Sequence, residues 1–277
     1  MNSFLKRALT GLGYAFVLIA GMIIHPVIFA AVYIALMVLA LVEYYRLVEL
    51  AGGKPQYING IATGITFFVS MFGYTYGLWP LYISLLSVVL LFSTFVVELF
   101  RKQPKPMSNI AFTLMGFFYI GLPIGLLNLL VFQGLPDEHL FYPNILLGIT
   151  ITLWVYDSGA YLFGTAFGKH RLFERISPKK SWEGVIGGGV VAMISGFLNS
   201  LFFPSVDLIN WLIISLILVV FGTFGDLIES MLKRSFNIKD SGKFLPGHGG
   251  ILDRLDSFLF AIPFVVAWLF LARLNNF

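Results

Sequence analysis

The stretch LINWLIISLILVVFGTFGDLIESML, residues 208–232, contains no charged residue apart from Asp226 and Glu229. A helix rises ~1.5 Å per residue, so about 20 residues cross the ~30 Å of hydrocarbon in a bilayer. This stretch is long enough to do so, and Lys233 and Arg234 follow it directly. We therefore expect a transmembrane helix that carries two carboxylates into the membrane and ends at a basic surface.

Apolar stretches of this kind recur along the whole chain. Of the 277 residues, 58% are hydrophobic and only 12% are charged, whereas about 25% of the residues in soluble domains are charged. A water-soluble fold does not fit this composition, and the sequence predicts an all-α, polytopic integral membrane protein with about nine transmembrane helices. The expected spans are 8–24, 26–45, 57–76, 78–99, 108–134, 141–167, 184–204, 208–232 and 255–274.

Lysine and arginine alternate between the expected loops. Every loop that joins an even-numbered span to the next odd-numbered span is basic, whereas the other loops contain no Lys or Arg. Cytoplasmic loops retain positive charge, so we expect the N-terminus to lie in the cytoplasm. We expect the protein to lie in the inner membrane of the cell, with its active site facing the cytoplasm. Lys6-Arg7 before an apolar run also resembles a signal peptide, but we interpret it as the first span. The net charge of +4 fits loops beside anionic lipid headgroups and requires no nucleic-acid partner.

The acidic residues suggest a division of function near residue 135. The first five spans carry only Glu43 and Glu98 at depth. We expect residues 1–135 to form a scaffold with possible lipid or dimer contacts, and residues 136–277 to form the catalytic region. The chain has no cysteine, which excludes disulfides, thiolate metal sites and cysteine nucleophiles. Any metal must therefore be held by oxygen or imidazole.

Three carboxylates fall inside the later spans. Asp226 lies on the order of 10 Å below the end of its span, and Asp157 lies deeper still, 12 residues before Lys169. Such residues are normally paired, metal-bound or turned to a water-filled cavity. A structural reading, in which each aspartate bonds a neighbouring helix, stays open. Glu229 shares a face with Asp226 at i+3 but can equally pair with Lys233 at i+4.

The sequence HGGILDRLD, residues 248–256, opens the last span. Asp253 and Asp256 at i and i+3 project together from the start of a helix. Together with Asp226 they would form an oxygen-rich site of the kind that magnesium prefers. The alternative is that they only complement the helix dipole, which explains Asp253 but not the second acid.

Glycines precede these acids. Gly247, Gly249 and Gly250 allow positive φ and a close approach of backbone amides to an anion. With the basic residues around them, we expect a polyphosphate cradle rather than an ordinary turn. His248 is a candidate phosphate donor or proton carrier, and a structural role in the loop is its alternative. Earlier in the chain, Pro178 and Gly184 confine Lys179 and Lys180 to a short turn beside a glycine-rich helix start, where phosphate could dock.

At this point the sequence resembles the phosphatidate cytidylyltransferases, also called CDP-diacylglycerol synthases. Their C-terminal signature is matched by Ser230, Leu232, Lys233-Arg234, Lys239-Asp240, Gly242, Leu245-Pro246, His248-Gly249-Gly250-Ile251 and Asp253-Arg254-Leu255-Asp256. Upstream, Asp157-Ser158-Gly159-Ala160-Tyr161, Gly164, Gly168-Lys169 and the SPKKSWEG loop at 177–184 are also similar to that family. The similarity is strong over about residues 150–260 and weak before them.

The resemblance implies that phosphatidate and CTP give CDP-diacylglycerol and pyrophosphate, with Mg²⁺ required. It assigns Asp226, Asp253 and Asp256 to the metal, with Asp157 and Glu229 available for a second cation of unknown identity. The expected catalytic residues are Asp226, Asp253, Asp256, Lys233, Arg254 and His248. The expected phosphate-binding residues are Lys179, Lys180, Ser177, Ser181, Arg234, Lys239, Gly249 and Gly250.

Three other kinds of protein compete with this interpretation. An ion-coupled transporter would carry protons or sodium on intramembrane acids, but it predicts carboxylates near the midplane, whereas most of these acids cluster beside two basic loops. Another membrane nucleotidyl or prenyl transferase would use aspartate-bound magnesium, but its paired Asp motifs on two helices at wider spacing are not seen in this sequence. A purely structural scaffold would not need the clustered charges. The expected partners are CTP, phosphatidate and membrane lipids, with a homodimer left open.

Overall fold

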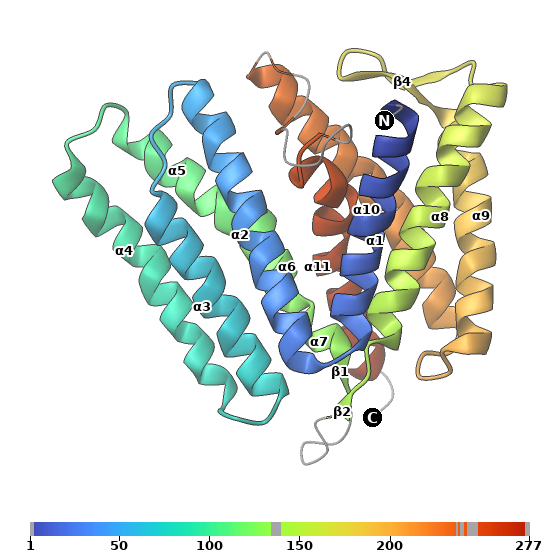
Figure 1. Cartoon of the computed structure of the whole chain (residues 1–277), viewed down its shortest axis with the longest axis horizontal. Coiled ribbons are helices and arrows are strands. Elements are labelled where there is room, and N and C mark those ends of the chain that lie inside the picture. The colour runs from blue at the N-terminus through green and yellow to red at the C-terminus, as the bar shows by residue number, and fades with distance from the viewer. Residues whose placement is uncertain (1–2, 134–139, 237, 239–240, 243–248, 275–277) are drawn as a thin grey trace. The chain divides into compact units, whose positions relative to one another are not determined.

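The computed structural model describes residues 3–133, 140–236, 238, 241–242 and 249–274. Within these residues the chain is almost wholly helical, which confirms the all-α prediction (Figure 1). The long helices are α1 (Ser3–Ile23), α2 (Pro26–Leu50), α3 (Tyr57–Thr75), α4 (Leu85–Arg101), α5 (Pro106–Gly116), α8 (Asn144–Phe167), α9 (Trp182–Phe202), α10 (Leu208–Ser235) and α11 (Leu252–Leu274). The short elements are η1 (Leu81–Ser84), η2 (Phe117–Gly121), α6 (Leu122–Leu126), α7 (Asn128–Val131), β1 (Phe132–Gln133), β2 (Leu140–Phe141), β3 (Arg171–Phe173) and β4 (Ser177–Ser181).

Helices occupy each of the expected spans, and the protein is a polytopic membrane protein. In the described part of the chain, 7 helical segments are long and apolar enough to cross a bilayer. The apolar part of α1, Gly11–Ile23, is shorter, and α3 is not among those segments. The count of nine spans and the cytoplasmic N-terminus therefore remain predictions.

The fifth expected span, 108–134, is not one regular helix. It consists of α5, the π-helical turn η2, α6 and α7 in succession. Pro123 lies at the start of α6 and has no N–H, so it cannot donate to the carbonyl four residues earlier. A local π turn is one way in which a helix accommodates such a lost bond.

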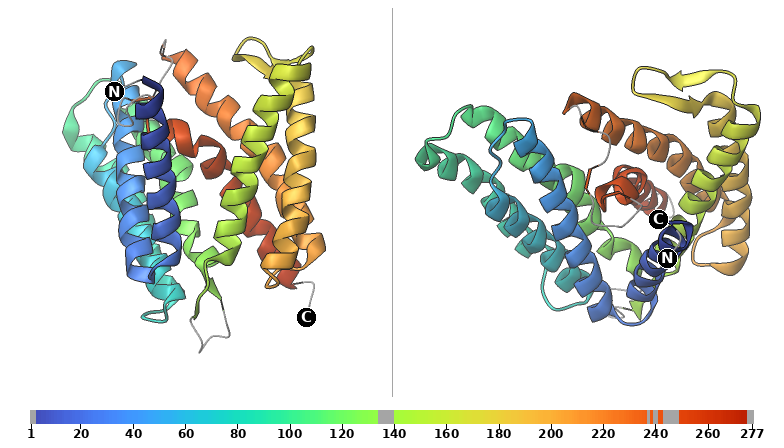
Figure 2. Two further views of the ribbon diagram at one scale, coloured as in Figure 1. Left: turned by 45° about the vertical axis from the view of Figure 1, so that its right-hand side comes forward. Right: turned by 45° about the horizontal axis from the view of Figure 1, so that its top comes forward.

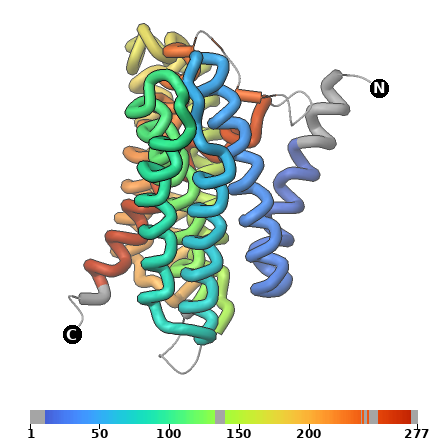
Figure 3. Tube along the Cα trace, turned by 90° about the vertical axis from the view of Figure 1, so that its left-hand side faces the viewer, coloured from blue at the N-terminus to red at the C-terminus, as the bar shows by residue number. Residues whose placement is uncertain are grey.

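The chain divides into two compact units. The first comprises Met1–Tyr142 and Ser235–Arg254, and the second comprises Pro143–Arg234 and Leu255–Phe277. In the first unit α2 supplies the core through a stripe at every fourth position, Phe29, Tyr33, Met37, Leu41 and Tyr45, all of which are buried. This spacing places the five side chains on one helix face. Helices α2, α3 and α4 run side by side (Figure 3).

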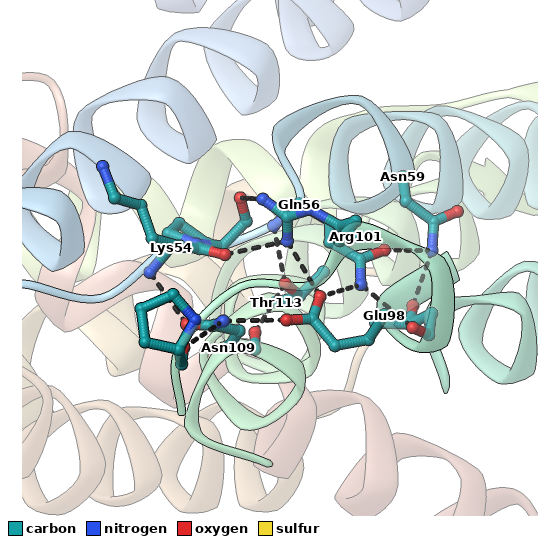
Figure 4. A network of polar contacts seen from close by, with 10 residues as sticks. Lys54, Gln56, Asn59, Glu98, Arg101, Asn109 and Thr113 are labelled. Carbon is teal, nitrogen blue, oxygen red and sulfur yellow. Dashed lines mark hydrogen bonds and ion pairs between the residues drawn. The ribbon is translucent and has the colours of Figure 1, made fainter. Parts of the chain in front are cut away.

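A polar network around Glu98 joins two basic loops of the first unit (Figure 4). Glu98 accepts hydrogen bonds of 2.8 Å from Gln56 Nε2 and from Asn109 Nδ2, and its carboxylate forms an ion pair with Arg101 at 2.9 Å. Arg101 also donates to the carbonyl of Lys54 at 2.9 Å. The loops after α2 and after α4 therefore lie at the same end of this unit, as the alternation of charge predicts for that pair of loops.

In the second unit, small residues bring helices into close contact. A Cβ on Gly188 of α9 would lie 2.8 Å from the carbonyl oxygen of Tyr156 in α8, and one on Gly184 would lie 2.7 Å from that of Ala160. The antiparallel hairpin β3–β4 projects at the end of this helix pair (Figure 2). Small residues at such contacts let transmembrane helices pack by dispersion forces where no hydrophobic effect acts between them.

Helices α10 and α11 also meet at a glycine. A Cβ on Gly225 would lie 2.6 Å from the carbonyl oxygen of Asp256 and 2.9 Å from the Cβ of Phe260. Phe221 and Phe264 stack about one turn away, with ring centroids 3.6 Å apart. The backbone of α10 at residue 225 therefore lies directly against α11.

Replacing Glu98 by glutamine tests the network of the first unit. The amide nitrogen of glutamine turns a donor toward the amide and guanidinium donors, so we expect a loss of about 2–3 kcal/mol of stability. Thermal unfolding in detergent measures it. The exposed Glu49, which accepts from the Tyr57 hydroxyl at 2.8 Å, is the matched control, and Glu49→Gln should change stability by less than about 0.5 kcal/mol. Equal effects of the two variants would contradict the network's role.

Gly225→Ala tests the contact between α10 and α11. The added methyl group meets backbone atoms that cannot rotate away, so we expect a destabilisation of about 1–3 kcal/mol. Gly189→Ala is the control in the same unit, because its Cβ would meet the Val219 side chain at ordinary contact distances, with Cγ1 at 3.6 Å and Cγ2 at 3.9 Å. Thermal midpoints of the two variants should differ clearly, and equal midpoints would refute the close approach.

Candidate active site

Asp226 is the centre of the polar groups in the second unit. Its Oδ2 forms an ion pair with Lys180 Nζ at 2.5 Å, and its side chain keeps 36% exposure. Ser230, one turn later, donates to Oδ1 at 3.3 Å. The neighbouring Gly225 allows α11 to approach at this level. The carboxylate is therefore held between α10, α11 and the end of the β3–β4 hairpin.

Asp256 of α11 joins Asp226 in this region. Its carboxylate accepts a hydrogen bond from Ser257 N at 2.7 Å and lies within electrostatic range of Asp226, Asp157 and Lys180. Asp226 of α10 and Asp256 of α11 therefore lie within interaction range of each other, and Asp157 of α8 lies within range of Asp256. Ionised carboxylates near one another repel, and a cation among them relieves this repulsion.

The two lysines of strand β4, Lys179 and Lys180, differ in burial and in their neighbours. Lys180 is half-buried beside Asp226, whereas Lys179 is exposed. The side chains of successive residues in a strand point to opposite faces, which separates the two. Ser177 is half-buried at the start of β4. Of the predicted phosphate-binding residues in this loop, Lys180 is the one that the structure places against the acids.

Ser181 has a structural role that the sequence analysis did not assign. It is buried, and its hydroxyl accepts a hydrogen bond of 3.2 Å from Gly184 N as the N-cap of α9. Glu183 in the first turn of α9 accepts hydrogen bonds from Lys169 N at 3.1 Å and from His170 N at 3.2 Å. These contacts fix both ends of the hairpin to α9. The binding of phosphate by Ser181 stays a prediction.

Glu229 pairs with Lys233. The two side chains form an ion pair at i+4 along α10, and Glu229 is buried. This is one of the two alternatives that the spacing allowed. Binding of a second cation by Glu229 therefore stays a prediction that competes with an observed ion pair.

Asp253 lies in the first unit, in the first turn of α11. Its Oδ2 accepts hydrogen bonds from Gly250 N at 2.8 Å and from Ser241 N at 3.1 Å. Gly249 has a φ of +84°, which confirms the expected left-handed backbone at this glycine run. The N–H of Gly250 already donates to Asp253, so the first role of this turn in the structure is to bind a carboxylate of its own chain.

The remaining predicted residues divide into two groups. Arg234 and Arg254 are exposed, where the guanidinium groups can reach anionic substrates. His248 and Lys239 lie outside the described residues. Their predicted roles in proton transfer and phosphate binding therefore stay predictions.

The acids of the second unit suit a divalent cation that takes part of its ligands from the protein and the rest from substrate phosphates and water. In the described part of the chain, no three Asp, Glu or His side chains converge closely enough to enclose a metal ion by themselves. Magnesium usually keeps several waters and binds through one or two carboxylates plus substrate phosphates. Asp226 and Asp256 supply that number, with Asp157 nearby.

The sequence did not reveal the partners of two further acids, Glu183 in the second unit and Glu43 in the first. Glu183 stood inside the SPKKSWEG motif, but no local pattern showed that it accepts bonds from Lys169 and His170. Glu43 was visible as a lone acid in an apolar span, and its side chain faces the segment before α11. An isolated carboxylate in a transmembrane stretch is a signal for a specific partner, but the partner cannot be read from the chain order.

Comparison with known proteins places this arrangement in a family. Residues 5–272 match the cytidylyltransferase family. The phosphatidate cytidylyltransferase of Staphylococcus haemolyticus (strain JCSC1435) is 36% identical over 228 residues, which cover 81% of this chain and 84% of that protein. Those of Staphylococcus aureus (strain COL) and Staphylococcus saprophyticus are 36% and 37% identical, over 82% and 81% of this chain and 85% and 84% of those proteins. The chain belongs to the cytidylyltransferase family.

Proposed function

We propose that the protein is a phosphatidate cytidylyltransferase, which transfers the cytidylyl group of CTP to phosphatidate and releases pyrophosphate. The observation that carries the proposal is the group of Asp226, Asp256 and Lys180 at one end of apolar helices. Relatives of the same length and about 36% identity are named for this reaction. An ion-coupled transporter is set aside because the family is one of nucleotidyl transfer.

The reaction joins two anions. A phosphate oxygen of phosphatidate attacks the α-phosphorus of CTP, and the bond from that phosphorus to the bridging oxygen of the β-phosphate breaks. Pyrophosphate leaves with the electron pair of that bond. The attacking oxygen is already ionised, so no strong general base is needed, and the protein contributes mainly position and charge stabilisation.

The described side chains suit these tasks. The Lys180 ammonium group pairs with Asp226, and it can instead bind a substrate phosphate that enters the site. Lys179, Arg234 and Arg254 are exposed cations that can attract and orient CTP and the lipid headgroup. We assign Lys233 to a supporting role through its ion pair with Glu229.

Asp226 and Asp256 would hold a divalent cation, with Asp253 and Asp157 as further candidates. When bound, Mg²⁺ would neutralise charge on the triphosphate and help to orient it. Magnesium is preferred because the candidate ligands are all oxygen atoms. The basic loops support a site at the cytoplasmic face of the inner membrane, and we assign residues 1–135 to its scaffold.

Turnover by the purified protein tests the function. With CTP, phosphatidate and Mg²⁺ we expect release of pyrophosphate and formation of CDP-diacylglycerol, measured by a coupled phosphate assay and by lipid chromatography. EDTA should abolish both products, because the acids then lack the cation, and added Mg²⁺ should restore them. No product from protein that is folded in detergent, or full activity in EDTA, would contradict the proposal.

Asp256→Asn tests the carboxylate pair. The substitution keeps the shape and removes the charge, so kcat should fall on the order of a hundredfold or more. The control is Asp207→Asn. Asp207 is an exposed carboxylate of the same unit that accepts from Asn210 N at 2.7 Å, and asparagine can cap in the same way. Wild-type kcat in Asp256→Asn would remove Asp256 from the mechanism.

A further inference from the structure

Glu43 of α2 caps a helix that begins far along the chain. The residue is 7% exposed, and its Oε2 accepts a hydrogen bond of 2.9 Å from Leu252 N, 209 residues later. Leu252 is the first residue of α11. The first N–H groups of a helix have no acceptor within it, and the helix dipole favours a negative charge at that end. Glu43 meets both needs.

Two glycines make room for this carboxylate. A Cβ on Gly242 would lie 2.5 Å from Glu43 Oε1, and a Cβ on Gly250 would lie 2.5 Å from Oε2. Neither distance is tolerated by real side chains, so the carboxylate reaches the backbone because both positions are glycine. The N–H of Ile251 and the hydroxyl of Ser241 lie beside it as well. Glu43 is therefore surrounded by the described residues of the segment that leads into α11.

Asp253 holds the same segment from the other side. It accepts the N–H groups of Ser241 and Gly250, while Glu43 accepts that of Leu252. Two carboxylates thus divide the amides of Ser241, Gly250 and Leu252 between them. A displacement of the Glu43 carboxylate would release Leu252 N. The first turn of α11, from which Asp253 projects, would then be free to shift.

We propose that Glu43 is a positioning residue for cytidylyl transfer, which orients Asp253 by anchoring residues 241–242 and 250–252 to α2. The inference rests on the proposed function, since the orientation of Asp253 matters for turnover only if that acid serves the reaction. Glu43 itself contacts no reacting atom in this account. It gives the N-terminal helices a part in the chemistry beyond that of a scaffold.

Glu43→Gln is the principal test. Glutamine has the same shape but no charge, so the bond to Leu252 N weakens, and we expect kcat to fall about tenfold to a hundredfold. The KM for CTP should stay within about threefold of wild type, because the substitution removes no group that binds substrate. Hydrogen–deuterium exchange of peptides within 249–256 should rise in the same variant, while exchange of the other helices stays unchanged.

Glu98→Gln is the matched control, because Glu98 is a buried carboxylate of the same unit with partners elsewhere. It should speed hydrogen exchange near residues 54–56 and 94–113 and leave the exchange of peptides 249–256 unchanged. At temperatures well below its unfolding midpoint, its kcat should equal that of wild type. Wild-type kcat and exchange in Glu43→Gln would overturn the proposal. A rise in exchange spread over all helices would overturn it too, since it would show general destabilisation.

A double-mutant cycle provides an independent test. Gly242→Ala places a methyl group against Glu43 Oε1, so alone it should lower kcat about tenfold or more. In a Glu43→Ala background the methyl group meets no carboxylate, and Gly242→Ala should then change kcat by less than about twofold. Equal effects in both backgrounds would show that the glycine does not serve Glu43.

The exchange measurement separates this proposal from the proposed function. If wild-type protein makes no CDP-diacylglycerol, the reaction is wrong, but faster exchange at 249–256 in Glu43→Gln still shows that Glu43 anchors the segment. If wild type is active and the variant exchanges as wild type does, the anchoring is wrong and the reaction stands.

Discussion

A carboxylate among apolar helices persists only where donors or cations compensate its charge, because water is excluded there. The intramembrane acids of this protein satisfy that constraint in different ways. Glu98 accepts hydrogen bonds from two side-chain amides and pairs with an arginine, and these partners come from three segments. Glu229 forms an ion pair with Lys233. Glu43 accepts a hydrogen bond from the N-terminus of a helix. The need to compensate these charges determines which loops and helix ends are joined.

The group around Asp226 differs from the other three. Lys180 pairs with Asp226, and Asp256 lies within electrostatic range of Asp226, Asp157 and Lys180, so carboxyl groups are concentrated there rather than matched one to one. Such a concentration is costly for a purely structural site and useful for one that binds a cation with phosphates. Under the proposed function, the matched carboxylates belong to the framework of the protein and the concentrated ones to the reaction.

Glycine makes both arrangements possible. Gly225 lets α11 approach beside Asp226, and Gly242 and Gly250 let Glu43 reach the backbone. In a membrane, close packing and hydrogen bonding replace the hydrophobic effect as the forces between helices. A methyl group at any of these positions would move a carboxylate away from its partners, so the glycines govern electrostatics as much as packing.

The sequence by itself determined the helices and the basic loops, because hydropathy and charge are local properties. It left open whether Glu229 pairs with Lys233 or shares a site with Asp226, and it predicted that Asp226 and Asp256 serve one site. It could not give the π turn at Phe117–Gly121, the cap that Ser181 supplies to α9, the ion pair of Lys180 with Asp226, or the bond from Leu252 to Glu43. Each of these depends on which backbones approach one another within a unit, and that choice is made by packing between segments distant in the chain.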